Sequence, residues 1–178
     1  MPVQVIDKTD QTDPRVYGGV MEADGVLLHH TGSRNEAGDE MWLSTYHANP
    51  VSTNQLVKRD GTIIQIVPNN RVAWHAGASV WDGRPDCNSW MIGIEICNAG
   101  TGNEPYTAAQ VEAVAQTVAY NCARYKIPDR NVTTHAKVAL PAGRKNDPKG
   151  FPLEMMWNRI RGIRQAWPFD IPMWACME

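Results

Sequence analysis

The sequence predicts an α/β protein with a single mixed β-sheet and helices packed on both of its faces. Two observations support this prediction. Apolar, strand-like runs alternate along the chain with segments of helical spacing, which favours a largely parallel sheet. An Asp-Gly pair between two β-prone runs predicts an antiparallel hairpin, so the sheet must be mixed.

The expected strands follow from runs of apolar and β-branched residues. Residues 25–29 and 91–97 are apolar at consecutive positions, as buried strands are. The hairpin joins residues 51–57 to 62–67 through Asp60-Gly61, and a short strand over 131–134 leads into His135. The polar residues 1–24 and the stretch 71–89 show no regular period, so we expect both to be irregular.

Three helices are expected. The first spans residues 35–47, carries Met41, Trp42 and Tyr46 on one side, and ends at Asn49-Pro50. The second begins at Thr107, where Gln110 completes a capping box, and it ends at Ile127-Pro128. The third spans residues 153–165.

Length and composition limit the possible classes of protein. The 178 residues suit one domain (1–178), with a core of about 25–165 and an apolar C-terminal tail, 166–178, that we expect to pack on it. A net charge of -2 does not support nucleic-acid binding. No apolar run is long enough to span a membrane and no signal peptide is visible, so we expect synthesis in the cytoplasm. We also expect a monomer.

The chain has four cysteines, at positions 87, 97, 122 and 176. None forms a C-x-x-C pair, which argues against a structural zinc site. An even number permits disulfides, but a chain of this size does not need them. Cys97 lies in an apolar strand-like run and Cys122 on an apolar helix face, so we expect both to be buried and unreactive.

Two histidines and one carboxylate are candidate metal ligands. His29 and His135 each follow a strand-like run, and Asp147 comes shortly after His135 in a turn-rich loop. Two imidazoles and a carboxylate suit a catalytic zinc ion, because they leave the fourth tetrahedral position open. Alternation along a strand places only one of His29 and His30 on a given face. The alternative is that each histidine is structural.

Glu95 and Lys145 are candidate catalytic residues. Glu95 interrupts an apolar strand, so it either faces solvent or lies near the metal as a general base. Lys145 lies two residues before Asp147, and on an extended loop both side chains share one side. A lysine there can stabilise an oxyanion, although a loop lysine is often merely solvated.

Five motifs together point to a known family: LLHHTGS around His29, KRDGTIIQIVP, RVAWHAG, IGIEICN around Glu95, and GRKNDP before and after Asp147. In this order and spacing, from about Gly25 to Arg164, the chain resembles the type 2 N-acetylmuramoyl-L-alanine amidases. These share their fold with the peptidoglycan recognition proteins and the phage amidase lysozymes. The resemblance implies one zinc ion held by His29, His135 and Asp147, with Glu95 and Lys145 as catalytic residues.

The chain departs from the family pattern before the hairpin. The family often has tyrosine or histidine there, whereas this chain has Ser52-Thr53-Asn54-Gln55. Asn54 therefore becomes a candidate substrate contact. Trp74 and His75 are candidate contacts at the rim of the site, with ordinary packing as the alternative.

The resemblance implies hydrolysis of the amide between N-acetylmuramic acid and L-alanine, with peptidoglycan or muropeptides as substrate. We expect a lytic, endolysin-like enzyme of a phage or bacterium that reaches the wall by release or delivery, or one that acts on cytoplasmic muropeptides. One alternative is a non-catalytic recognition module of the same fold, a kind that tends to lose the third ligand. An unrelated zinc hydrolase is the other.

Overall fold

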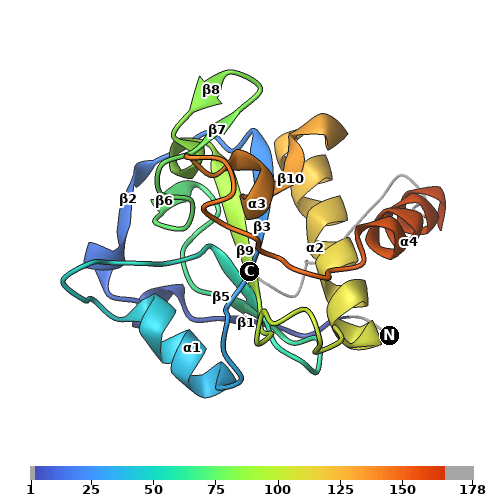
Figure 1. The fold of residues 1–178 in the computed structure, drawn as a ribbon, viewed down its shortest axis with the longest axis horizontal. Helices are drawn as coiled ribbons and strands as arrows, with labels where there is room; N and C mark the ends of the chain where they lie inside the picture. Colours follow the sequence, from blue (N-terminus) through green and yellow to red (C-terminus); the bar gives the residue numbers. More distant parts are fainter. Residues whose placement is uncertain (1–2, 167–178) are drawn as a thin grey trace.

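Six strands form the central sheet of the computed structural model, which describes residues 3–166 (Figure 1). In sheet order they are β1 (Val5–Asp7), β5 (Ile63–Gln65), β4 (Gln55–Val57), β9 (Met91–Ile96), β3 (Gly25–His30) and β10 (Val132–Thr134). The strands from β4 to β10 run parallel, β5 is antiparallel to β4, and β1 is parallel to β5. The predicted mixed sheet and its hairpin are confirmed.

The two faces of the sheet carry different parts of the core. Val26 and Leu28 of β3 and Ile94 of β9 pack toward α2 (Ala108–Tyr125) and α4 (Leu153–Ala166). Figure 1 shows α4 lying beside α2. Leu27 packs on the opposite side with Val138 of α3 (His135–Val138). Because side chains alternate along a strand, His29 and Glu95 face this second side.

Helix α2 forms where the sequence predicts it. The Thr107 hydroxyl accepts from the Gln110 backbone N–H, and the Gln110 side chain accepts from the Thr107 N–H, which completes the capping box. Valines and alanines along one stripe are buried, each valine contributing roughly 1.5–3 kcal/mol. In the described residues, no helix has the length and apolarity that a membrane span requires.

Two segments expected to be irregular contain strands. The N-terminal 24 residues include β1 and β2 (Tyr17–Val20), and residues 71–89 include β6 (Arg71–Ala73), β7 (Val80–Trp81) and β8 (Arg84–Pro85). Short 3-10 turns occur at Thr9–Gln11, Pro14–Val16, Cys87–Ser89 and Asp129–Asn131. Strand β1 pairs with β5, and β2 pairs antiparallel with β6. The irregular structure predicted for these segments was wrong because all of these strands are too short to show a period. Partners distant in sequence stabilise β1, β2 and β6, and β7 pairs with the adjacent β8.

Helix α1 (Glu36–Ser44) is shorter than the helix expected over residues 35–47. Its Asn35 cap accepts from the Gly38 backbone N–H. Leu43 is its buried residue, whereas Met41 and Trp42 are 65% and 51% exposed and Tyr46 is also exposed. The side that carries Met41, Trp42 and Tyr46 therefore faces out of the core. The expected packing of the tail concerns residues 167–178, which lie outside the described residues.

Three cysteines are free and buried: Cys87, Cys97 and Cys122. This confirms the burial expected of Cys97 and Cys122. Burial raises the pKa of the Cys122 thiol to about 11 and that of Cys97 further still. Thiolate is the reactive form, so both thiols are protected by their pKa as well as by access.

We predict slow alkylation of these three thiols in the folded protein. With a pKa near 11, about one Cys122 thiol in a thousand is ionised at pH 8. Intact-mass analysis after iodoacetamide treatment of a Cys176→Ser variant should show almost no adduct in buffer and three adducts in urea. Rapid labelling in buffer would contradict the buried assignment.

Candidate metal centre and active site

The sheet brings His29 and His135 together at the carboxyl ends of two neighbouring parallel strands. Strands β10 and β3 pair in register, with Thr134 opposite Leu28, so the next residues along are His135 and His29. Ligand sites in such sheets lie at this edge. Asp147 arrives on the loop after α3, where its carbonyl accepts from the Ala136 backbone N–H at 2.9 Å.

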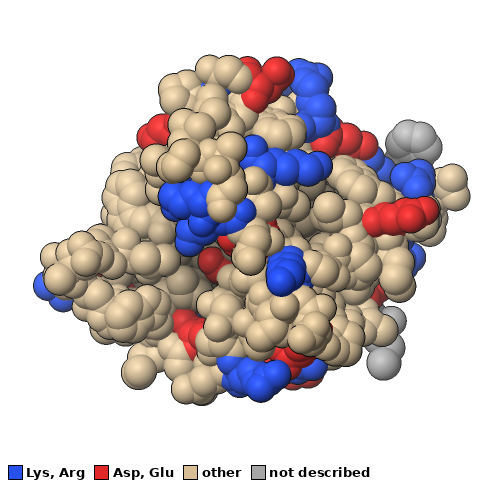
Figure 2. All heavy atoms as spheres, viewed as in Figure 1, with Lys and Arg blue, Asp and Glu red and all other residues tan. Residues whose placement is uncertain are grey.

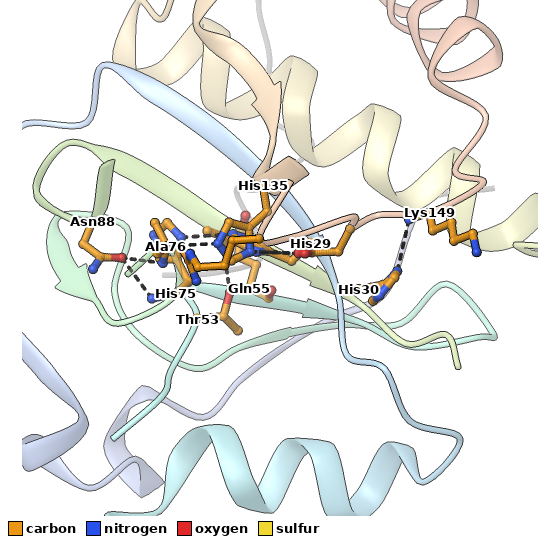
Figure 3. Close-up of polar contacts among 12 residues, drawn as sticks. His29, His30, Thr53, Gln55, His75, Ala76, Asn88, His135 and Lys149 are labelled. Carbon is orange, nitrogen blue, oxygen red and sulfur yellow. Dashed lines mark hydrogen bonds and ion pairs between the residues drawn. The ribbon is translucent and has the colours of Figure 1, made fainter. Parts of the chain in front are cut away.

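The three predicted ligands converge on one point. His29 Nδ1 lies 3.0 Å from His135 Nδ1 and 3.1 Å from Asp147 Oδ2, and His135 Nδ1 lies 2.9 Å from the same oxygen. All three side chains are buried. Figure 3 shows the His29 and His135 rings side by side, with His30 directed away toward Lys149. His29, and not His30, therefore joins the cluster, as strand alternation predicts.

The groups behind the histidines determine which nitrogen carries the proton. His135 Nε2 is 2.9 Å from the Ala76 carbonyl, which can only accept, so this nitrogen is protonated. His75 Nε2 likewise donates to the Met91 carbonyl at 3.1 Å. His75 Nδ1 is then an acceptor, and His29 Nε2 donates to it at 3.1 Å. When both rings are neutral, His29 and His135 therefore each present an unprotonated Nδ1 to the centre.

Such a centre suits a cation. Burial lowers the pKa of His29 to about 4 despite the opposing effect of Asp147, so its imidazole is neutral at pH 7. Burial would raise the pKa of Asp147, but pairing with His135 and His29 outweighs it and holds that pKa below its usual range. Two lone pairs and a carboxylate oxygen that face one another repel unless an ion lies between them. Ligands of a tetrahedral zinc ion are about 3.3 Å apart, close to the observed spacing.

Glu95 lies beside this centre on β9, opposite His29 in the strand register. It is 8% exposed, and its Oε2 has no hydrogen-bond partner among the described residues. Burial, followed by the negative charge of Asp147, raises its pKa to about 8; Lys145 opposes this and Asp39 adds to it. The solvent-facing alternative for Glu95 is therefore excluded. An unpartnered buried carboxyl is typical of a site that receives a ligand or water.

A cavity of about 340 Å³ opens onto the centre and is bordered by Glu95, His135 and Asp147, with α1 on another side. Lys145 and Asn146 also line it. Figure 2 shows acidic atoms inside a hollow on this face, with Lys and Arg atoms along its edge. The sequence did not reveal that α1 borders the cavity, although the aromatic residue Trp42 could have suggested a binding surface there.

Arg144 holds the loop that carries Lys145. Its guanidinium donates to the carbonyls of Ala76, Ala78 and Leu140 at 2.7–3.1 Å. The Ala76 carbonyl is the same one that orients His135. The lysine loop and the histidine ligand are therefore anchored to a common backbone group.

Asn54 is buried and does not line the cavity, contrary to the expected substrate contact. Its amide nitrogen donates to the carbonyls of Pro68 and Arg71 at 3.0 and 3.1 Å. Its oxygen accepts from the Gly93 backbone N–H at 2.9 Å. With both ends of the amide occupied, Asn54 ties β9 to the segment between β5 and β6.

Of the two residues expected at the rim of the site, His75 borders the cavity and Trp74 does not. The His75 ring is buried behind His29, and both of its nitrogens are occupied, although its edge borders the cavity. Asn88 holds the backbone of His75 and Ala76 by accepting from both N–H groups, as Figure 3 shows. Trp74 is half-buried against Gly18 and is not among the residues that line the cavity. Its contact with substrate stays a prediction.

Comparison with known proteins places this fold and centre in one family. The sequence model of the family described as N-acetylmuramoyl-L-alanine amidase matches residues 19–150, most of the chain. The chain belongs to this amidase family, known as Amidase_2. It is 42% identical to the 1,6-anhydro-N-acetylmuramyl-L-alanine amidase AmpD of Citrobacter freundii over 113 residues, 64% of this chain and 57% of that protein. It is 37% identical to the amidase AmiD of Escherichia coli over 158 residues, 80% of this chain and 54% of that protein. The matches thus span little more than half the length of these relatives.

Solved structures show the same fold. A crystal structure of an AmpD derivative has a TM-score of 0.69 at 27% identity and covers 91% of this chain and 94% of its own. AmiD of E. coli in complex with the substrate anhydro-N-acetylmuramic acid-L-Ala-D-γ-Glu-L-Lys has a TM-score of 0.67 at 28% identity, over 79% of this chain and 58% of its own. PlyL, at 22% identity and a TM-score of 0.66, shares the fold.

We predict that His75→Ala weakens metal binding about 10–100-fold, because it removes the acceptor that fixes the tautomer and orientation of His29. Competition with a chromogenic chelator measures this affinity. His30→Ala is the matched control: it removes a cavity-lining imidazole that is absent from the ligand cluster, so affinity should be unchanged. Equal losses in both variants would contradict the supporting role of His75.

Proposed function

We propose that this chain is a zinc-dependent amidase that hydrolyses the amide between N-acetylmuramic acid and L-alanine in muropeptides. The observation that carries the proposal is the buried convergence of His29, His135 and Asp147 beside an unpartnered Glu95 in one cavity. Membership of the amidase family and the printed activities of AmpD and AmiD support it. The metal would be a single zinc ion on these three ligands.

Zinc, when bound, would polarise the scissile carbonyl and lower the pKa of a water molecule. Glu95 Oε2 accepts a proton from the attacking water as the water oxygen bonds to the carbonyl carbon. The same carboxyl returns that proton to the amide nitrogen when the carbon–nitrogen bond breaks, which releases the free amine of L-alanine. Burial raises the pKa of this carboxyl, and a zinc ion on the neighbouring residues would lower it again, toward the range in which the carboxyl can both take the proton and return it.

Lys145 contributes a positive charge at the opposite side of the same cavity. Its ammonium stabilises the negative charge that develops on the carbonyl oxygen during attack. The three backbone contacts of Arg144 position the loop that carries it. Glu95 and Lys145 therefore act on the proton and on the oxygen, respectively.

Soluble muropeptides are the substrates that we favour, in the cytoplasm or wherever wall fragments gather. Several curated relatives are 1,6-anhydro-N-acetylmuramyl-L-alanine amidases, and the AmiD complex holds an anhydro-tripeptide that ends in L-lysine. The lytic, endolysin-like role is the narrower alternative, since the endolysins of Clostridium intestinale and Bacillus subtilis match at 18% and 24% identity, below AmpD and AmiD. We also propose that residues 1–178 form one monomeric amidase domain. A non-catalytic recognition module is disfavoured because the third ligand, Asp147, is present.

Digestion with the zinc-loaded protein tests the proposed bond. Mass spectrometry of a soluble anhydromuropeptide should show free anhydro-N-acetylmuramic acid and an intact stem peptide with an L-alanine N-terminus. Chelation with dipicolinate should abolish the products, and added zinc should restore them. Parallel digestion of intact sacculi separates the two roles: comparable release of stem peptides would favour lysis, and cleavage at any other bond would refute the assignment.

We predict that Glu95→Gln keeps zinc and lowers kcat by roughly 10²–10⁴, because the amide cannot take the proton. Asp147→Asn should instead lose zinc and activity together. Metal content by atomic emission, measured beside single-turnover rates, distinguishes these outcomes. Loss of zinc in the Glu95 variant would make Glu95 structural and leave the reaction without its base.

A further inference from the structure

Helix α1 supplies a wall of the catalytic cavity that the proposed mechanism does not use. Asp39, Trp42 and Leu43 border the same cavity as Glu95 and Asp147. Asp39 and Trp42 are three residues apart, so they lie on one side of the helix. This pair combines a carboxylate with a large aromatic face at the entrance to the reacting groups.

Asp39 differs from the other acids of α1. Glu40 pairs with Lys8 and Lys58, and Glu36 accepts from the Arg59 backbone N–H at 2.6 Å. Asp39 Oδ2 is buried, and it has no hydrogen-bond partner among residues 3–166. The residue as a whole is only partly buried and lines the cavity, so its charge is available to a cation that enters there.

Trp42 is held so that one face of its ring stays available. Its indole stacks on the His47 ring, with centroids 3.7 Å apart and planes inclined by 17°. The side chain is nevertheless half exposed, because the stack covers only one face. A Trp face is the best aromatic partner for a cation, and a nearby carboxylate adds direct charge pairing.

We propose that Asp39 and Trp42 form a subsite for a primary ammonium group of the substrate. The ammonium pairs with the Asp39 carboxylate and lies against the free face of Trp42. On this basis the enzyme prefers stem peptides in which a diamino residue, such as lysine, keeps its side-chain amine free. The inference rests on the proposed function for its choice of substrate, but the subsite can be tested by binding alone.

The test compares two anhydromuramyl tripeptides that end in L-lysine, one with a free ε-amine and one with an ε-N-acetyl group. Calorimetric titration of the Glu95→Gln protein avoids turnover. The free amine should bind at least about fivefold more tightly, the scale of a partly desolvated cation–π contact. The double variants that add Asp39→Asn or Trp42→Ala should bind both peptides equally, with the acetylated peptide affected little.

Met41→Ala in the same background is the control, because Met41 is the neighbouring exposed residue on α1 and does not line this cavity. It should preserve the fivefold preference. Equal binding of both peptides to the parent protein, or no binding of either, would overturn the subsite. An equal loss for both peptides in the Asp39 variant would overturn it too, since Asp39 would then support the shape of the cavity without recognising the amine.

Failure of the proposed function gives a different pattern. A wild-type protein that never cleaves the amide, yet binds the free amine preferentially through Asp39 and Trp42, would leave the subsite in place and remove the amidase reaction. Circular dichroism of each variant checks that it is folded. Asp39→Asn preserves the shape of the side chain, and the half-exposed Trp42 makes limited contact with the core.

Discussion

Two carbonyl oxygens determine the chemistry of this protein. The Met91 carbonyl accepts from His75, which in turn accepts from His29, and the Ala76 carbonyl accepts directly from His135. Both His29 and His135 therefore direct Nδ1 at the Asp147 carboxylate. With both rings neutral, three electron-rich atoms lie about 3 Å apart in a buried site, an arrangement that positive charge at its centre would stabilise. The sheet, the Asn88 contacts and the Arg144 anchor all hold these carbonyls and rings in place.

The sheet register carries the rest of the site. Because β9, β3 and β10 are parallel neighbours in register, Glu95, His29 and His135 reach one edge from three strands. The same alternation sends His30 the other way and buries Glu95 without a partner. A slip of one residue would turn His29 into the apolar face packed by α2, so the core that fixes the register also protects the metal centre.

Much of this could be predicted from the sequence, because the signals were local. Asp60-Gly61 marked the hairpin, Thr107 and Gln110 marked the start of α2, and an acid inside an apolar run marked Glu95. Other features depend on contacts between distant residues. Strand β1 exists through β5, His75 supports a residue 46 positions away, and both ends of Asn54 are taken up by distant backbone. The sequence did not show where the aromatic side of α1 lies, because that depends on the loops around the cavity that Trp42 borders.

The most direct measurement is anomalous diffraction at the zinc edge from crystals of the zinc-loaded protein. The account predicts one strong peak, about 2.0–2.2 Å from His29 Nδ1, His135 Nδ1 and Asp147 Oδ2. The unligated Nε2 atoms should keep their contacts with His75 and the Ala76 carbonyl. A peak bound through Nε2 of either histidine, or one that lies away from Asp147, would contradict the tautomers on which the whole site depends.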